Sequence, residues 1–152
     1  MMPVAEWLRL LENSSWALAI RQSAWLYPFL EIVHITGIVI LVGAAFMFDL
    51  RLLGFSKHLP AGDLGRHLLT WSVRGLLLVV PSGILLFITN ASTLGYDPVF
   101  WTKMALLAAA GGNALFFRRV APPAESARAK TVAVLSLLLW LAVIACGRLL
   151  AY

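Results

Sequence analysis

The stretch PFLEIVHITGIVILVGAAF, residues 28–46, decides the fold class of this chain. Its only polar side chains are Glu31, His34 and Thr36. The run is close to the ~20 residues that cross the hydrocarbon core of a bilayer as an α-helix. It therefore predicts a transmembrane helix. In a membrane Glu31 and His34 need an explanation, because ionisable side chains are costly there and tend to face one another or a cavity.

The composition extends this interpretation to the whole chain. Of the 152 residues, 61% are hydrophobic and 12% are charged, against about 25% charged in a typical soluble domain. Four apolar stretches predict transmembrane helices, over residues 27–50, 70–90, 98–118 and 130–151. They use most of the chain, so we expect one integral membrane domain, residues 1–152. Short connections predict an all-α, up-down bundle of four transmembrane helices with the lipid bilayer as its partner.

Residues 4–22 predict an amphipathic helix that lies in the membrane interface. Trp7, Leu10, Leu11 and Leu18 fall on one helical face, and the charged side chains lie largely off it. Such a helix buries its apolar face at the boundary between headgroups and acyl chains. The polar triplet at residues 13–15 is the point at which we expect the helix to break.

The net charge of +5 is distributed unevenly along the chain. The second connection, NASTLGYDPVFW (90–101), contains no Lys or Arg. Basic residues gather in or beside the first and third connections: Arg51, Lys57, Arg66, Arg74, Arg118, Arg119, Arg128 and Lys130. This positive-inside pattern predicts that the first and third connections lie in the cytoplasm and that both termini face outward. In a Gram-negative bacterium the protein would then lie in the inner membrane with both termini in the periplasm. Because topology explains the basic surplus, nucleic acid is not expected as a partner.

This topology converts position in the sequence into depth in the membrane, at ~1.5 Å per residue. It predicts an outer layer of polar residues: Glu31, His34, Asn90, Lys103 and Arg148. It predicts a second layer on the cytoplasmic side: Asp49, Arg51, His67, Arg74 and Asn113. The outer layer has two interpretations, an ion-pair belt in which Glu31 pairs with Lys103 or Arg148, and a ligand site. In the cytoplasmic layer the long basic side chains can extend to the headgroups.

As a ligand site, the outer layer suits a b-type haem. His34 offers the imidazole for the iron, with Glu31 one turn away, and Gly37 would let a flat ring approach the helix. Lys103 and Arg148 would neutralise the propionates. The second axial ligand stays open, because His67 is predicted to lie roughly 20 Å away in depth. A di-iron site is not favoured, because Glu-x-x-His occurs once and such sites use it on two helices.

Several motifs resemble an uncharacterised bacterial family of small four-helix integral membrane proteins, a domain of unknown function. They are WLYPFLEIVHITG, DLRLLG, DPVFWTKMALL and ACGRLLAY. A looser likeness is to HemJ-type protoporphyrinogen oxidases and CopD-like copper-resistance proteins, which are also compact helical membrane proteins. The HemJ counterparts here are His34, Arg51 and Trp101-Thr102-Lys103. That resemblance implies His34 as a haem ligand and Lys103 as a residue needed for activity.

Two functions from different classes follow. The first is a haem b or porphyrin protein in electron transfer or porphyrin redox chemistry, with His34 as the metal ligand. The second is a non-enzymatic membrane scaffold or a small-molecule or lipid-binding module, in which Glu31, His34 and Lys103 form a structural polar cluster. The residues identify no catalytic group, so enzymatic activity stays open, as do a homo-oligomer and a redox partner. Small residues in 105–112 also predict close helix contacts on the third span.

Overall fold

A computed structural model describes residues 2–152, and this part of the chain contains seven helices and no strand. Four helices are long and apolar enough to cross a membrane. They are α3 (Leu26–Leu52), α4 (Ala61–Thr89), α6 (Pro98–Val120) and α7 (Ala127–Leu149). The others are α1 (Val4–Glu12), α2 (Ser15–Gln22) and α5 (Ala91–Leu94). The predicted all-α bundle of four transmembrane helices with an N-terminal amphipathic segment is confirmed.

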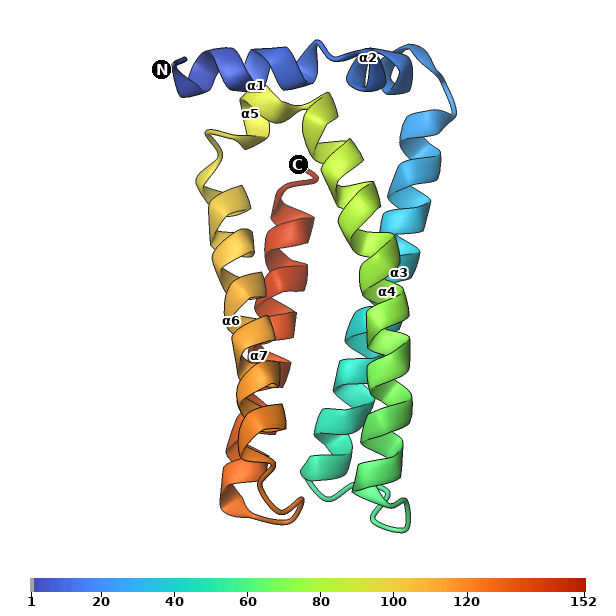
Figure 1. The fold of residues 1–152 in the computed structure, drawn as a ribbon, viewed down its shortest axis with the longest axis vertical. Helices are drawn as coiled ribbons and strands as arrows, with labels where there is room; N and C mark the ends of the chain where they lie inside the picture. The colour runs from blue at the N-terminus through green and yellow to red at the C-terminus, as the bar shows by residue number, and fades with distance from the viewer. Residues whose placement is uncertain (1) are drawn as a thin grey trace.

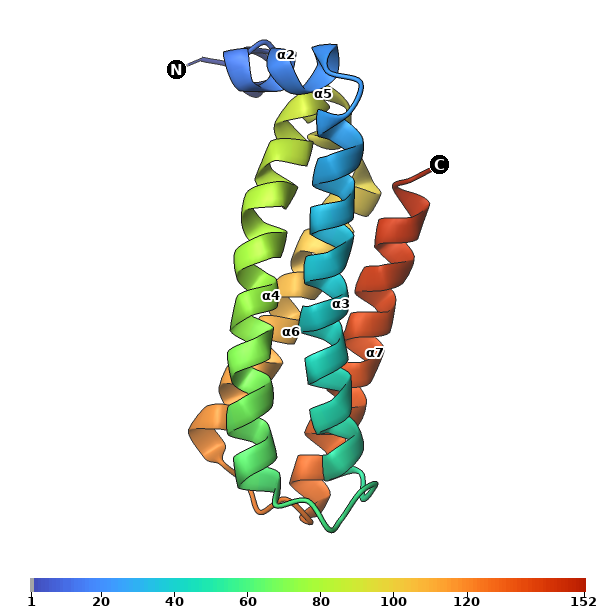
Figure 2. The ribbon, with the colours of Figure 1, turned by 90° about the vertical axis from the view of Figure 1, so that its right-hand side faces the viewer.

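The four long helices run up and down, and α1 and α2 lie across one end of them (Figure 1). That end is called the α1–α2 end, and both chain termini lie toward it (Figure 2). The opposite end, called the far end, carries the connections 53–60 and 121–126. The same arrangement appears in both views, so depth along the bundle can be judged from position in each helix.

The ends of most helices follow from local sequence. Asp97 opens α6 by accepting a hydrogen bond from the N–H of Val99 at 2.7 Å, and Ser126 opens α7 in the same manner. Ser14 accepts from the N–H of Ala17 and starts α2, so the amphipathic segment breaks where the sequence predicts. These side chains satisfy N–H groups that a helix N-terminus leaves without partners.

The start of α4 differs from the prediction, because the helix begins at Ala61 and not near residue 70. Pro60 stands just before it with φ −60° and ψ 120°, an extended conformation that ends the preceding loop. Asp63 lies in the first turn, where a negative charge faces the positive end of the helix, and it pairs with Arg66. A polar beginning therefore extends the helix beyond its apolar run.

The long helices associate as two hairpins. Contacts are most extensive between α3 and α4 and between α6 and α7, and the hairpins meet through α3 and α7. Large apolar side chains point outward, including Phe29, Ile32 and Ile35, which are 59%, 63% and 59% exposed. Lipid is as apolar as these side chains, so close helix contact in a membrane depends on packing between small residues.

Gly37 of α3 and Gly75 of α4 form a close helix contact. A Cβ on Gly75 would lie 2.7 Å from the backbone N of Leu41 and 2.8 Å from the carbonyl oxygen of Gly37. A Cβ on Gly37 would lie 2.8 Å from Cγ2 of Val79. Neither atom fits, so the two glycines set the separation of α3 and α4. Gly112, on the face of α6 predicted to pack closely, has nothing within 4 Å.

An apolar cluster joins the two hairpins at the far end. Leu52 of α3 is buried against Ala129 and Ala133 of α7. Phe48 of α3 meets Phe117 of α6 edge to face, with ring centroids 5.5 Å apart. The far-end cluster, defined by these five residues, therefore brings α3, α6 and α7 together.

Arg51, next to this cluster, does not extend to the headgroups as predicted. It is 8% exposed. Its Nε donates to the carbonyl oxygen of Leu59 at 2.7 Å and its Nη2 to that of Lys57 at 3.3 Å. Because its donors are used inside the protein, Arg51 holds the connection between α3 and α4 against the bundle.

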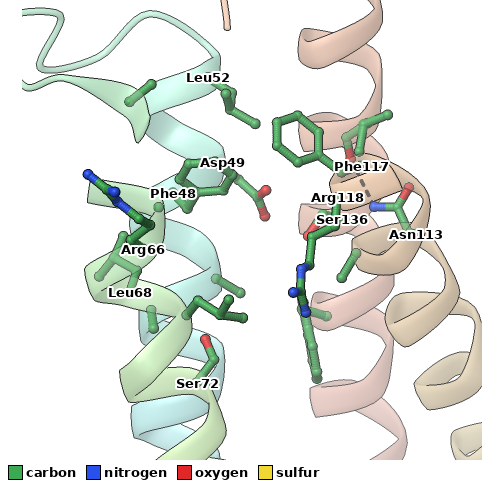
Figure 3. Close-up of a pocket in the computed structure, with 18 of the residues that line it drawn as sticks. Phe48, Asp49, Leu52, Arg66, Leu68, Ser72, Asn113, Phe117, Arg118 and Ser136 are labelled. Carbon is green, nitrogen blue, oxygen red and sulfur yellow. Dashed lines mark hydrogen bonds between the residues drawn. The ribbon is translucent and has the colours of Figure 1, made fainter. Parts of the chain in front are cut away.

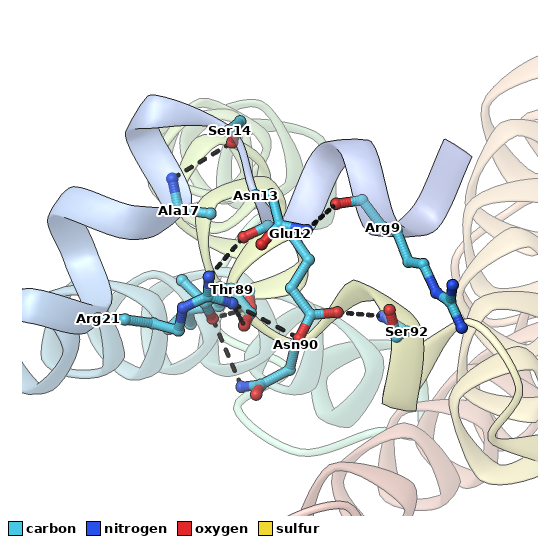
Figure 4. A network of polar contacts seen from close by, with 10 residues as sticks. Arg9, Glu12, Asn13, Ser14, Ala17, Arg21, Thr89, Asn90 and Ser92 are labelled. Atoms are coloured by element: carbon cyan, nitrogen blue, oxygen red, sulfur yellow. Dashed lines mark hydrogen bonds and ion pairs between the residues drawn. The ribbon is translucent and has the colours of Figure 1, made fainter. Parts of the chain in front are cut away.

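A polar network fastens α1 and α2 to the bundle (Figure 4). Arg21 donates to the carbonyl oxygens of Thr89, at 3.1 Å, and Glu12, at 2.7 Å. The Glu12 carboxylate lies 3.5 Å from the Arg21 guanidinium and accepts from the N–H of Ser92 at 2.9 Å. The network of Glu12, Arg21, Thr89 and Ser92 therefore joins α1, α2, α4 and α5.

We predict that Gly75→Ala destabilises the bundle by about 1–3 kcal/mol, the usual cost of forcing an extra carbon into a packed contact. Its Cβ would meet the backbone of α3, which cannot move aside as a flexible side chain would. Thermal unfolding of the purified protein in detergent measures the change. Gly43→Ala is the control, because a Cβ there meets nothing within 4 Å. Equal melting temperatures for the two variants would contradict the glycine contact.

We predict that the attachment of α1 and α2 weakens in acid. Hydrogen bonding by Ser92, through its side chain and its N–H, lowers the pKa of Glu12 against a smaller effect of burial, and the Arg21 charge lowers it further. A lowered pKa contributes stability above the ordinary value of 4.5 that is lost as pH falls through the folded-state value. Hydrogen-exchange protection of residues 4–22, corrected for intrinsic rates, should therefore drop below about pH 4.5.

Glu12→Gln should show low protection at pH 6 and little further change in acid. Glu6→Gln is the matched control, because Glu6 is an exposed acid on the same helix, and it should titrate as the natural protein does. A Glu12→Gln variant with the natural pH profile would show that Glu12 does not hold these helices.

Candidate functional site

His34 lies on α3 and directs its ring at α4. Its Nδ1 is 3.1 Å from the carbonyl oxygen of Val79 and 3.0 Å from Oγ of Ser82. A carbonyl oxygen only accepts, so Nδ1 carries the hydrogen. The Ser82 hydroxyl donates to the carbonyl oxygen of Leu78, which leaves it free to accept from Nδ1–H. In the neutral ring this arrangement leaves the lone pair on Nε2 available for a ligand.

The helix pair also explains why this ring fits. A Cβ on Gly83 would lie 3.0 Å from Cε1 of His34, so glycine at that position lets the ring lie against α4. The ring is half-buried. His34 and Ser82 are at similar distances from the ends of α3 and α4 that meet at the α1–α2 end. Counting residues along α3 and α4 from that end could therefore have placed Ser82 at the depth of His34. It could not have shown which way either side chain points.

Lys103 lies on the other hairpin, facing α7. Its Nζ is 3.9 Å from the position of a Cβ on Gly147, so the ammonium group sits beside the glycine backbone. Arg148 is exposed and donates to the hydroxyl of Tyr152 at 2.6 Å, with its guanidinium 4.4 Å from the centre of that ring. The two basic residues predicted for the outer layer therefore have separate surroundings.

The predicted ion-pair belt does not form. Glu31 is exposed, and the ion pairs within residues 2–152 are Arg21 with Glu12 and Arg66 with Asp63. His34 turns toward α4, and Glu31 forms no ion pair with α6 or α7 among these residues. The polar partners of His34 are accordingly Val79 and Ser82 rather than Glu31 and Lys103.

Gly37 also differs from its expected role. It was expected to leave an open face for a flat ring, but Val79, Leu78 and Gly75 of α4 occupy the space beside it. Asn90, the remaining outer residue, lies at the end of α4, where its side chain is 3.5 Å from Oγ of Thr89. Among the residues of the predicted outer layer, His34 is therefore the one whose ring is oriented by a hydrogen bond and keeps a nitrogen available for a ligand.

Residues 2–152 contain no alternative centre for a bare metal ion. Among residues 2–152, no three His, Cys, Asp or Glu side chains come together in a way that could hold one. His67 is exposed toward the far end, and its Nε2 accepts from the indole N–H of Trp71 at 3.2 Å. It cannot be a second ligand on the same group as His34, in agreement with the predicted separation in depth.

A cavity of about 480 Å³ lies between the two hairpins near the far end (Figure 3). Asp49 points into it from α3, and it is 6% exposed. Its Oδ2 has no hydrogen-bond partner anywhere in residues 2–152. The sequence places Asp49 in the cytoplasmic layer without giving it a role. The sequence feature that could have pointed to Asp49 is the run GAAFMFDL (43–50), in which it is a lone acid at the end of an apolar stretch.

Comparison with known proteins assigns this chain to a family. A family model described as a family of unknown function (DUF6644) matches residues 23–152. The chain belongs to this family. The match includes α4, α6, α7 and all of α3, so the DUF6644 segment contains both His34 and Asp49. No curated protein and no solved structure matches the chain. The predicted membership in an uncharacterised four-helix family is confirmed.

We predict that His34 is a neutral imidazole protonated at Nδ1, which ¹⁵N NMR of labelled histidine distinguishes from the Nε2–H form. Ser82→Ala should keep this tautomer, because the carbonyl oxygen of Val79 remains as acceptor. It should also lower stability by about 1 kcal/mol through the lost hydroxyl contacts. Thr102→Val is the control, since the Thr102 hydroxyl bonds only within α6. An Nε2–H tautomer in the natural protein would contradict this arrangement.

Proposed function

We propose that this DUF6644 protein binds a b-type haem or a porphyrin through Nε2 of His34. The observation that supports the proposal most is the hydrogen bond from Nδ1 to the carbonyl oxygen of Val79. Histidines that ligate metals usually donate their other ring N–H to a carbonyl or carboxylate, which fixes the ring and increases its basicity. His34 has this second hydrogen bond in place.

The residues around His34 fit a haem better than a bare metal ion. One imidazole suffices to hold a haem iron from one side, whereas a metal ion without a macrocycle needs several protein ligands. Lys103, on the facing hairpin, is the basic residue we propose for a propionate. Glu31 and Arg148 are not part of this proposed site, because Glu31 is exposed and Arg148 donates to Tyr152. Gly37 is not part of it either, because α4 occupies the space beside it.

A haem held in this way would supply one-electron redox chemistry, and the proposed role is electron transfer or porphyrin redox chemistry. His34 would anchor the group, and the bond to Val79 would keep the imidazole neutral and oriented. Lys103 would pair with a carboxylate of the group. We propose that the site faces the periplasmic half of a bacterial inner membrane, because the basic connections favour the far end for the cytoplasm.

The non-enzymatic alternative, a small-molecule or lipid-binding module, has a different basis in this molecule. The polar cluster of Glu31, His34 and Lys103 on which it was based does not form, since His34 is bonded to α4. What favours binding of a small molecule is the separate cavity into which Asp49 points.

Absorption spectra test the haem proposal. The full chain is produced with ample haem supply and purified in detergent, and the Soret absorbance per protein is measured. The natural protein should carry haem, and His34→Ala should lose most of it because the imidazole is the anchor. His67→Ala is the matched control and should retain the natural spectrum. A natural protein without a Soret band, or an unchanged band in His34→Ala, would end the proposal.

A second measurement tests Lys103. Lys103→Met should weaken haem binding by roughly tenfold, the usual scale for losing one charge-assisted hydrogen bond. The same variant should bind haem dimethyl ester as the natural protein does, because the ester has no carboxylate to pair. Equal weakening for haem and its ester would instead assign Lys103 to packing.

A further inference from the structure

The far-end cavity is built mostly from apolar side chains of all four long helices. Its walls include Leu41 and Phe48 of α3, Leu68 of α4, Phe117 of α6 and Trp140 of α7. Its volume of about 480 Å³ lies within the range of about 300–1,000 Å³ typical of small-molecule sites. The space is therefore large enough for an apolar chain, and the few polar groups in it determine which head group can accompany that chain.

Asp49 is the acidic residue among the lining residues, and it is buried. Its side chain projects from α3 toward α6 and α7, with Ser136 and Asn113 across the space (Figure 3). The side-chain amide of Asn113 donates to the carbonyl oxygen of Val132 at 3.1 Å. Oδ2 of Asp49 is left without a partner within residues 2–152. A buried carboxylate is costly without a cation or several donors, so this position suits a ligand that supplies them.

The positive charges of the cavity are in a different situation. Arg66 is exposed and already paired with Asp63. Arg118 is also exposed, at the C-terminal end of α6, where a basic side chain faces the carbonyl end of the helix. Both residues are exposed, whereas Asp49 is buried. Among the buried lining residues, Asp49 is therefore the charged one.

We propose that this cavity binds an amphiphile whose polar end is a protonated amine, with the ammonium group at Asp49 and the alkyl chain along Leu41, Leu68 and Trp140. An ammonium group has three donors, which suits Oδ2 of Asp49 and the hydroxyl oxygen of Ser136, which can accept as well as donate. A carboxylate head would meet Asp49 with like charge, and an alcohol would leave the charge unpaired. The site is separate from His34 and does not depend on haem binding.

The helix arrangement gives such a ligand a route. The hairpins are in contact through α3 and α7, and α4 packs on α3 rather than on α6. The lining residues of α4 and α6, such as Leu69 and Ala114, therefore border the side on which the hairpins are not packed together. An alkyl chain dissolved in lipid can reach the cavity from that side without passing through water.

The test measures thermal unfolding of the purified full chain in a nonionic detergent at pH 7, with three probes that share one chain and differ in head group. Decylammonium should raise the melting temperature by about 5 °C at saturating concentration. Decanol and decanoate should give less than half of that rise. A response to decanoate or decanol as large as the response to decylammonium would overturn the proposal.

Three variants locate the response. Asp49→Asn, which keeps the shape and removes the charge, should abolish the preference for decylammonium. Ala114→Phe keeps Asp49 but fills the cavity, and it should also abolish the response, which decides the question even if Asp49→Asn does not fold. Glu31→Gln is the matched control, an exposed acid outside the cavity, and should respond as the natural protein does. A full response in both cavity variants would overturn the proposal.

A last pair of measurements separates the two sources of an alkylated amine. Lysophosphatidylethanolamine is compared with lysophosphatidylglycerol of the same chain length, and a rise for the former alone identifies a lipid head group as the natural ligand. A rise for decylammonium alone identifies a free amine. If neither amine raises the melting temperature and Ala114→Phe changes the oligomeric state, a second copy of the chain covers the cavity and the proposal fails.

Discussion

The close approach of α3 and α4 at Gly37 and Gly75 is the constraint on which the rest of the structure depends. Burial of apolar side chains does not by itself hold helices together in lipid, because the solvent is equally apolar. Backbone contact replaces it here. The same separation lets the His34 ring lie against Gly83 and reach Val79 on α4. It also brings Phe48 so close to Gly65 that a Cβ would lie 2.9 Å from its ring.

The second hairpin is attached differently, and the cavity follows from that difference. At the far end Leu52, Phe48 and Phe117 join it to α3. At the α1–α2 end the contact is indirect, because α1 packs on α5, which connects α4 to α6. Between these attachments α3 and α7 touch while α4 does not pack on α6. The cavity lies where residues of α4 and α6 face each other without packing together.

Local features of the fold were predictable from sequence, because they depend on neighbouring residues. The four apolar runs give the spans, and Asp97, Ser126 and Ser14 give the starts of α6, α7 and α2. The rotation of each long helix about its own axis was not predictable, because these helices are apolar on all sides and no polar face shows which side is buried.

That missing rotation accounts for the errors in the candidate site. Depth in the membrane correctly separates His34 from His67, but it does not say that Gly37 faces α4 or that Glu31 faces outward. It likewise cannot show that Asp49 points into a cavity while Arg51, two residues later, turns to the loop. An apolar run in the sequence gives the length of a helix and the depth of each residue in the membrane. Only contacts with other helices show which way each side chain points.

The network at the α1–α2 end has a consequence for the length of the second transmembrane helix. The last carbonyl groups of a helix have no partner within it. Arg21 donates to one of them, that of Thr89, while Glu12 accepts from Ser92 in the first turn of α5. One ion pair thus terminates α4 and initiates α5. Both of its residues precede the matched segment 23–152, so a protein trimmed to that segment would lose the donor and acceptor that finish α4, and its final turn would fray toward water.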